Sequence, residues 1–237
     1  MTPGEPGGAL APPTRAGHLK PPGRILVVML RRIGDVILTG PAARALKKLH
    51  PQARVDFLAE PPCHEALEGA AGVDRVVVYG REDGRDAPGP FAYFRSIAAV
   101  RAERYDWVVD YMGNPRSAAL TALSGAAVRA GPARSSHRWA YSHLLEQPAE
   151  ACYGPLEKIR MLKSLGLEPD ESDFMPRLEL PPAALRWAAE ELALLGAPPE
   201  ARGGPAGRGA SPLEGGWVGL VPASRRETRR WPAESYA

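Results

Sequence analysis

The sequence has few cysteines, little net charge and no long apolar segment, and each of these shortages excludes a class of protein. Cys63 and Cys152 are the only cysteines in 237 residues, which argues against a disulfide framework and fits a reducing compartment. The net charge of +3 is too small to predict binding to nucleic acid. The apolar run 25–30 is far shorter than the roughly 20 residues that a membrane helix needs. The composition of the whole chain, 44% hydrophobic and 24% charged residues, is typical of a globular protein.

Glycine and proline are concentrated in two segments, residues 1–23 and 197–216. Such segments bury too little apolar surface to offset the entropy lost on ordering. We interpret residues 1–23 as a disordered leader and residues 197–216 as a linker. Because the leader lacks the apolar core of a secretory signal, we expect a cytoplasmic protein.

Between these two segments, short apolar runs alternate with helical patterns. This alternation predicts an α/β fold: a parallel sheet with helices on both faces, formed by residues 24–196. The predicted strands are 24–30, 54–59, 74–79, 106–110 and 127–131. The predicted helices are a stretch ending near His50, then 62–69, 91–104, 116–123, 153–166 and 182–195.

After the linker the pattern starts again. Residues 217–221 read as another buried strand, and Pro232 is suited to the first turn of a helix. The sequence stops a few residues later. We therefore expect residues 217–237 to be the start of a second α/β domain, truncated just inside it.

The loop after the first strand is the best candidate for a site, because ligands of open parallel sheets bind beyond the carboxyl ends of the strands. It contains Asp35 beside Arg31 and Arg32, and it matches neither Gly-x-Gly-x-x-Gly nor a Walker phosphate loop. A dinucleotide-dependent dehydrogenase and a P-loop nucleotidase are therefore disfavoured. From the residues alone, Asp35 is either the cap of the following helix or a catalytic carboxylate.

Four blocks in order resemble glycosyltransferase family 9, the ADP-heptose:lipopolysaccharide heptosyltransferases. Residues 24–48, with Arg31-Arg-Ile-Gly-Asp35, resemble the opening of that family, and residues 56–60 resemble its second strand. The run Tyr105-Asp-Trp-Val-Val-Asp-Tyr-Met-Gly-Asn-Pro-Arg-Ser117 resembles a third block, and residues 218–234 resemble the start of its donor-binding domain. The resemblance implies the GT-B architecture of two Rossmann-like domains, with inverting, metal-independent chemistry.

The resemblance also implies roles for residues of the first domain. Asp35 matches the family's catalytic carboxylate, which would take the proton of the acceptor hydroxyl. The basic side chains before it suit phosphates on the acceptor, since guanidinium matches phosphate geometry. The expected acceptor-binding residues are Arg31, Arg32, Gly34, Asn114 and Arg116. Asn114 and Arg116 have a simpler interpretation, as parts of a turn in which Pro115 begins a helix.

In the second domain, Ser224, Arg225 and Arg229 match the family's donor motif and are expected to bind the diphosphate of the nucleotide sugar. The chain departs from the common family pattern with Ala223 in place of glycine and Arg229 in place of lysine. No Asp-x-Asp pair follows a strand, so neither a metal nor another cofactor is expected.

The predicted function is transfer of a heptose-like sugar from a nucleotide donor, ADP-heptose, to a lipopolysaccharide core or related glycolipid. Such an enzyme would work at the inner membrane surface without a spanning segment. Two alternatives stay open. One is a nucleotide-sugar epimerase of the same architecture; the other is a truncated, non-catalytic remnant. We also expect residues 1–237 alone to be inactive in transfer, because most of the donor domain would be missing.

Overall fold

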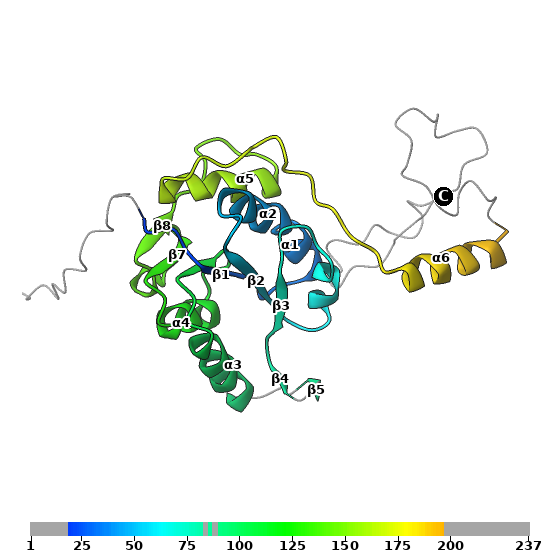
Figure 1. The fold of residues 1–237 in the computed structure, drawn as a ribbon, viewed down its shortest axis with the longest axis horizontal. Helices are drawn as coiled ribbons and strands as arrows, with labels where there is room; N and C mark the ends of the chain where they lie inside the picture. The colour runs from blue at the N-terminus through cyan, green and yellow to red at the C-terminus, as the bar shows by residue number, and fades with distance from the viewer. Residues whose placement is uncertain (1–18, 83–84, 87–89, 197–237) are drawn as a thin grey trace, which may run out of the picture. The chain divides into compact units, whose positions relative to one another are not determined.

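The computed structural model describes residues 19–82, 85–86 and 90–196 (Figure 1). The chain divides into two units, residues 1–179 and 180–237. The described part of the second unit contains α6, Pro182–Leu194, followed by Gly196 at a φ of 76°. The predicted strand 217–221 and the rest of the predicted second domain lie outside the described residues. The domain bounds of the sequence analysis therefore stay predictions.

The first unit contains a six-stranded sheet in which every neighbouring pair is parallel, in the order β3-β2-β1-β6-β7-β8. This confirms the predicted α/β class. A short antiparallel pair, β4 and β5, lies between the predicted strand 74–79 and the predicted helix 91–104. The strand bounds are β1 Arg24–Val28, β2 Arg54–Ala59, β3 Arg75–Val78, β4 Arg81–Glu82, β5 Arg85–Asp86, β6 Trp107–Asp110, β7 Val128–Pro132 and β8 His143–Leu145.

Helices cover both faces of this sheet (Figure 1). α1, α2 and α5 lie on one face, where Ile25 and Val27 of β1 are fully buried in the core. α3 and α4 lie on the other, where Leu26 and Val28 are fully buried. Burial on both faces explains why the first strand is apolar at consecutive positions. The helix bounds are α1 Ile33–Ile37, α2 Gly40–Leu49, α3 Pro90–Ala102, α4 Pro115–Leu123 and α5 Gly154–Met161.

The predicted helix ending near His50 is in fact two helices, α1 and α2. Pro41 explains the break, because proline has no N–H for the bond that would continue α1 and its ring would clash with the preceding turn. Instead it occupies the first turn of α2, where proline is tolerated, and Thr39 is the N-cap residue. The Thr39 hydroxyl donates to the Asp35 carbonyl at 2.7 Å.

Two other predicted helices are tighter or shorter than expected. The segment 62–69 forms a 3-10 helix, Cys63–Leu67, and the segment 153–166 changes from α5 to a 3-10 helix, Leu162–Leu165. Gly166 ends that segment as predicted, in the left-handed region at a φ of 73°. β8 was missed because three residues are too few to show a strand pattern.

The folded part also includes residues that the sequence placed in the leader. Leu19 packs against the core, and the backbone N–H groups of Gly23 and Arg24 both donate to Asp106 Oδ2, at 2.8 and 2.9 Å. The ordered chain therefore starts before Arg24. No helix among residues 19–82, 85–86 and 90–196 is long and apolar enough to cross a membrane.

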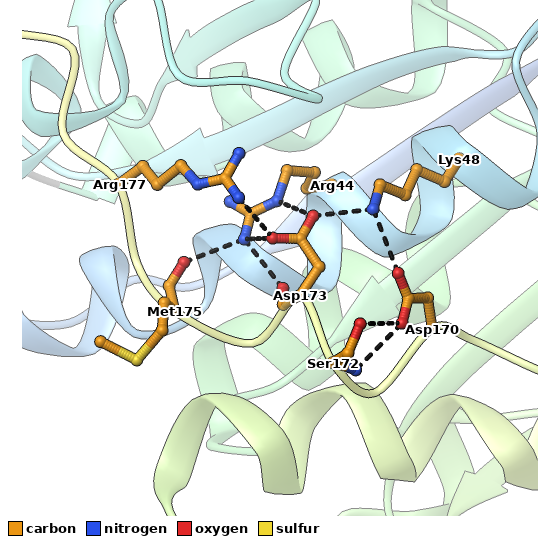
Figure 2. Close-up of polar contacts among 7 residues, drawn as sticks. All are labelled: Arg44, Lys48, Asp170, Ser172, Asp173, Met175 and Arg177. Atoms are coloured by element: carbon orange, nitrogen blue, oxygen red, sulfur yellow. Dashed lines mark hydrogen bonds and ion pairs between the residues drawn. The ribbon is translucent and has the colours of Figure 1, made fainter.

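A nearly buried ion pair holds the segment after α5 onto α2 (Figure 2). The Arg44 guanidinium donates to both carboxylate oxygens of Asp173 at 2.8 and 2.9 Å, and to the carbonyls of Asp173 and Met175 at 2.8 and 2.9 Å. Lys48 and Arg177 also contact the Asp173 carboxylate, each at 2.8 Å. This cluster fixes the path of the chain as it leaves the first unit.

Candidate active site

The carboxyl ends of the parallel strands meet at one edge of the sheet. β1 lies at the point where the strand order reverses: the chain runs outward through β2 and β3, then returns to place β6 on the other side of β1. Ligands of open α/β sheets bind at such a switch point, beyond the strand ends. The segments that follow β1, β2 and β6 therefore border the candidate site.

Asp35 lies at this edge, in the first turn of the five-residue helix α1. Its side chain is 35% exposed, and Arg31 Nε lies 3.6 Å from its Oδ2. The interpretation of Asp35 as a helix cap is wrong, because the N-cap residue is Arg32 and no side chain caps α1. Capping therefore does not explain the carboxylate, and its partial exposure leaves it accessible to a substrate.

The residues around Asp35 leave this surface open. Arg31 has an exposed side chain, and Arg32 is exposed and has no partner among the described residues. A Cβ built on Gly34 would meet no atom within 4 Å. Packing within the described chain therefore does not require glycine at position 34, whereas a ligand lying close to the backbone would.

Lys158 is a member of this cluster that sequence reasoning missed. It comes from α5, and the Tyr111 hydroxyl donates to its carbonyl at 3.1 Å. Burial lowers the pKa of its amine, an effect opposed by the nearby carboxylates of Glu157 and Asp35 and reinforced by Arg31. Only the packing of α5 beside α2 brings this cation near Asp35, so no local sequence pattern could have revealed it.

Asn114 and Arg116 begin α4, after β6. Asn114 is the N-cap residue: its Oδ1 accepts from the Ser117 N–H at 2.9 Å, while the Ser117 hydroxyl accepts from the Asn114 N–H at 3.2 Å. The simpler interpretation of this motif, a turn with Pro115 opening a helix, is therefore confirmed. Contact of Asn114 with an acceptor stays a prediction.

Arg116 is paired with an acid that the sequence analysis did not single out. Its Nη1 lies 2.9 Å from Glu60 Oε1, and its guanidinium carbon lies 5.6 Å from the centre of the Tyr79 ring. Glu60 directly follows β2, so its place at a strand end was the available signal. The structure thus brings Arg116 to the candidate site edge, but not as a lone cation.

Asp110 holds the loop that positions these residues. Its carboxylate is fully buried and accepts from the Tyr141 hydroxyl at 2.7 Å and from the N–H groups of Met112 and Gly113 at 2.8 and 3.2 Å. Burial raises the pKa of this carboxyl, while these donors act in the opposite direction. Asp110 therefore orients the loop leading to Asn114.

Comparison with known proteins identifies the family of this chain. The sequence profile of glycosyltransferase family 9 (heptosyltransferase) matches residues 93–237, more than half of the chain. The chain belongs to glycosyltransferase family 9. The matched residues begin after Asp35, so the case for Asp35 rests on its own sequence block and on its place in the fold.

Solved structures of family 9 proteins share the fold of this chain. A family 9 glycosyltransferase from Veillonella parvula aligns with a TM-score of 0.62 at 22% identity, over 75% of this chain and 50% of its own. Escherichia coli ADP-heptose LPS heptosyltransferase II aligns with a TM-score of 0.55 at 17% identity, over 75% of this chain and 52% of its own.

A curated relative is also found. A Haemophilus influenzae protein, whose name provisionally calls it a glycosyltransferase, is 23% identical over 124 residues, which are 52% of this chain and 34% of that protein. The family 9 chain thus spans between a third and about half of the length of these relatives.

Two groups of side chains therefore border the end of β1 in this family 9 chain. Asp35, Arg31 and Lys158 lie on the side of α2 and α5. Arg116 and Glu60 lie on the side of α3 and α4. The predicted donor-binding residues Ser224, Arg225 and Arg229 lie outside the described residues. Within the described ranges, no three His, Cys, Asp or Glu side chains gather as a metal site would require.

Proposed function

We propose that this protein transfers a heptose-like sugar from a nucleotide donor, ADP-heptose, to a lipopolysaccharide core or related glycolipid, with Asp35 as the general base. One observation carries the proposal: a partly exposed carboxylate, with no capping role, lies beyond the central strand of a family 9 chain. The donor sugar follows from the resemblance of the sequence to the heptosyltransferases.

The reaction is a single displacement that inverts the anomeric centre. The acceptor hydroxyl gives its proton to a carboxylate oxygen of Asp35 while its oxygen attacks the anomeric carbon of the donor sugar. The bond between that carbon and the diphosphate oxygen breaks, and ADP leaves with the bonding electrons. A positioned base of this kind accelerates a reaction by about 10²–10⁴-fold.

The acceptor binds on the first unit. Arg32 is exposed without a described partner, and the Arg31 side chain is 59% exposed, so both are available to phosphates on the acceptor. Gly34 leaves room for the acceptor to approach the backbone of α1. A glycolipid acceptor would place the enzyme at the cytoplasmic face of the inner membrane as a peripheral protein.

The donor binds through Ser224, Arg225 and Arg229. Basic side chains and a hydroxyl group compensate the charge that develops on a leaving diphosphate. The proposed reaction needs neither a metal ion nor another cofactor, because these groups and the base supply the charge compensation and the proton acceptor.

Asp35→Asn tests the proposal. In an enzyme with a complete donor domain, we expect the rate of ADP release in the presence of acceptor to fall by about 10²–10⁴-fold with little change in donor affinity, because the base acts mainly in the transition state. Glu168→Gln, which removes an exposed acid elsewhere, is the matched control. Unchanged turnover in Asp35→Asn would refute the base assignment, and donor turnover without acceptor would point to an epimerase instead.

A further inference from the structure

The guanidinium of Arg116 is engaged on two sides within the described chain. Glu60 Oε1 lies 2.9 Å from its Nη1, and the Tyr79 ring lies beneath it, 5.6 Å from its central carbon. The Tyr93 hydroxyl donates to the Arg116 carbonyl at 3.3 Å. The Arg116 side chain is still 49% exposed and that of Glu60 is 28% exposed, so a ligand can reach both.

This pair crosses the end of the central strand. Glu60 follows β2 and Arg116 belongs to the first turn of α4, after β6, while β2 and β6 flank β1 on opposite sides. A contact between them must therefore pass over the point where the chain leaves β1. That is the same edge that carries Asp35, so the pair borders the same candidate site.

The surroundings hold this pair in place. Tyr79 packs against the core on the side of α3 and α4, and the N–H of the next residue, Gly80, donates to Ser96 Oγ of α3 at 3.1 Å. Burial raises the pKa of Tyr79 and of Tyr93 above the ordinary value of 10.0. The cluster thus presents a cation, a carboxylate and hydroxyl groups with fixed positions.

The formal charge of the Glu60 and Arg116 pair differs from that of the part of the site around Arg32. Arg32 is exposed and pairs with no other residue that the structure describes, whereas Glu60 cancels the formal charge of Arg116. A phosphate that binds Arg116 has to approach the Glu60 carboxylate, and like charges this close repel strongly. A sugar hydroxyl meets no such repulsion, because it donates to Glu60 and accepts from Arg116 at the same time.

We propose that Glu60 and Arg116 form a subsite for the hydroxyl groups of an uncharged sugar ring of the acceptor, and that Glu60 excludes phosphate from it. The inference rests on the proposed function in one respect, namely that the sugar belongs to an acceptor. It makes Glu60 a specificity-determining residue and confines phosphate recognition to the side of Arg31 and Arg32.

The test is a binding measurement that needs no donor and no turnover. The Arg116 Nε–H signal is followed by nuclear magnetic resonance in the full chain and assigned with the Arg116→Lys variant. Inorganic phosphate and methyl α-D-mannopyranoside are the probes. We expect the mannoside to shift this signal in the wild type, and phosphate to bind at Arg116 at least about tenfold more tightly in Glu60→Gln than in the wild type.

Two variants separate the charge of Glu60 from any structural role. Glu60→Asp keeps the carboxylate and should still exclude phosphate, whereas Glu171→Gln, which breaks a comparable exposed pair with Arg160 at 2.9 Å, should leave the Arg116 signal unchanged. Equal phosphate affinity in the wild type and Glu60→Gln would overturn the inference. So would a wild-type Arg116 Nε–H signal that does not shift when the mannoside is added. Failure of the transferase assay with these binding results intact would instead count against the proposed function.

Discussion

Replacing Asp173 by asparagine should destabilise the first unit through the Arg44 cluster of Figure 2. The hydrogen bond from Arg44, followed by the contact with Lys48, holds the pKa of Asp173 at about 2, against an ordinary value of 3.8. At about 1.4 kcal/mol per pKa unit, this difference corresponds to about 2 kcal/mol of stability at neutral pH. The asparagine amide would also turn a donor toward the donors of Arg44, whose side chain is only 8% exposed. We therefore expect a loss of about 2–4 kcal/mol.

The sign of the pH dependence follows from the direction of the shift. Because the folded pKa lies below the ordinary value, the stabilisation is complete above about pH 4 and is lost as the pH falls through 2. The difference in stability between wild type and Asp173→Asn should therefore be large at pH 7 and should decrease toward pH 2.5. Thermal melts followed by circular dichroism measure it, with a shift of at least about 4 °C expected at pH 7.

Glu171→Gln is the matched control, since Glu171 lies two positions earlier and pairs with Arg160 at 2.9 Å and Lys163 at 2.6 Å in exposed contacts. Exposed pairs of this kind contribute about 0–1 kcal/mol. Equal melting temperatures of Asp173→Asn and Glu171→Gln at pH 7 would contradict the role given to Asp173. So would a gap between wild type and Asp173→Asn that stays constant down to pH 2.5.

Two other variants test the site directly. Gly34→Ala should leave the melting temperature unchanged or slightly higher, because a Cβ there meets no atom within 4 Å and alanine favours the helix by about 0.5–1 kcal/mol. In an enzyme with a complete donor domain, the same change should raise the acceptor KM in steady-state assays, and an unchanged KM would remove Gly34 from the site. Tyr141→Phe should cost about 1.5–3 kcal/mol in denaturant unfolding, because it removes a 2.7 Å hydrogen bond to the buried Asp110 carboxylate. The half-exposed Tyr153→Phe serves as its control, and equal stability of these two variants would contradict the role given to Tyr141.

Local sequence signals predicted much of the fold. Asn114 and Pro115 indicate the start of α4, and Gly166 indicates the end of the helical segment after α5. β2 is predicted with its observed bounds. The prediction was wrong where a local pattern was read too broadly. The apolar periodicity before His50 predicts one helix, whereas the structure has two, and Pro41 is the sequence signal for the break.

Within the candidate site, the Arg31 and Asp35 pair was visible from sequence because the two residues are separated by one helical turn and share one strand-end loop. The Glu60 and Arg116 pair was not, because it depends on which strands lie beside β1. Lys158 and Tyr141 were likewise invisible, since each reaches its partner from an element far along the chain.

Local sequence patterns are enough to predict the alternation of strands and helices, the family and the carboxylate that leads the candidate site. These depend on interactions within a few residues, or on blocks that keep their order along the chain. The order of strands around β1 is visible only in the folded chain, and this order sets which charges are paired and which are exposed. Strand order is set by how helices pack on the two faces of the sheet, and no single segment contains that information. For this reason the sequence could place Arg116 and Glu60 each near a strand end, while only the fold shows that they pair.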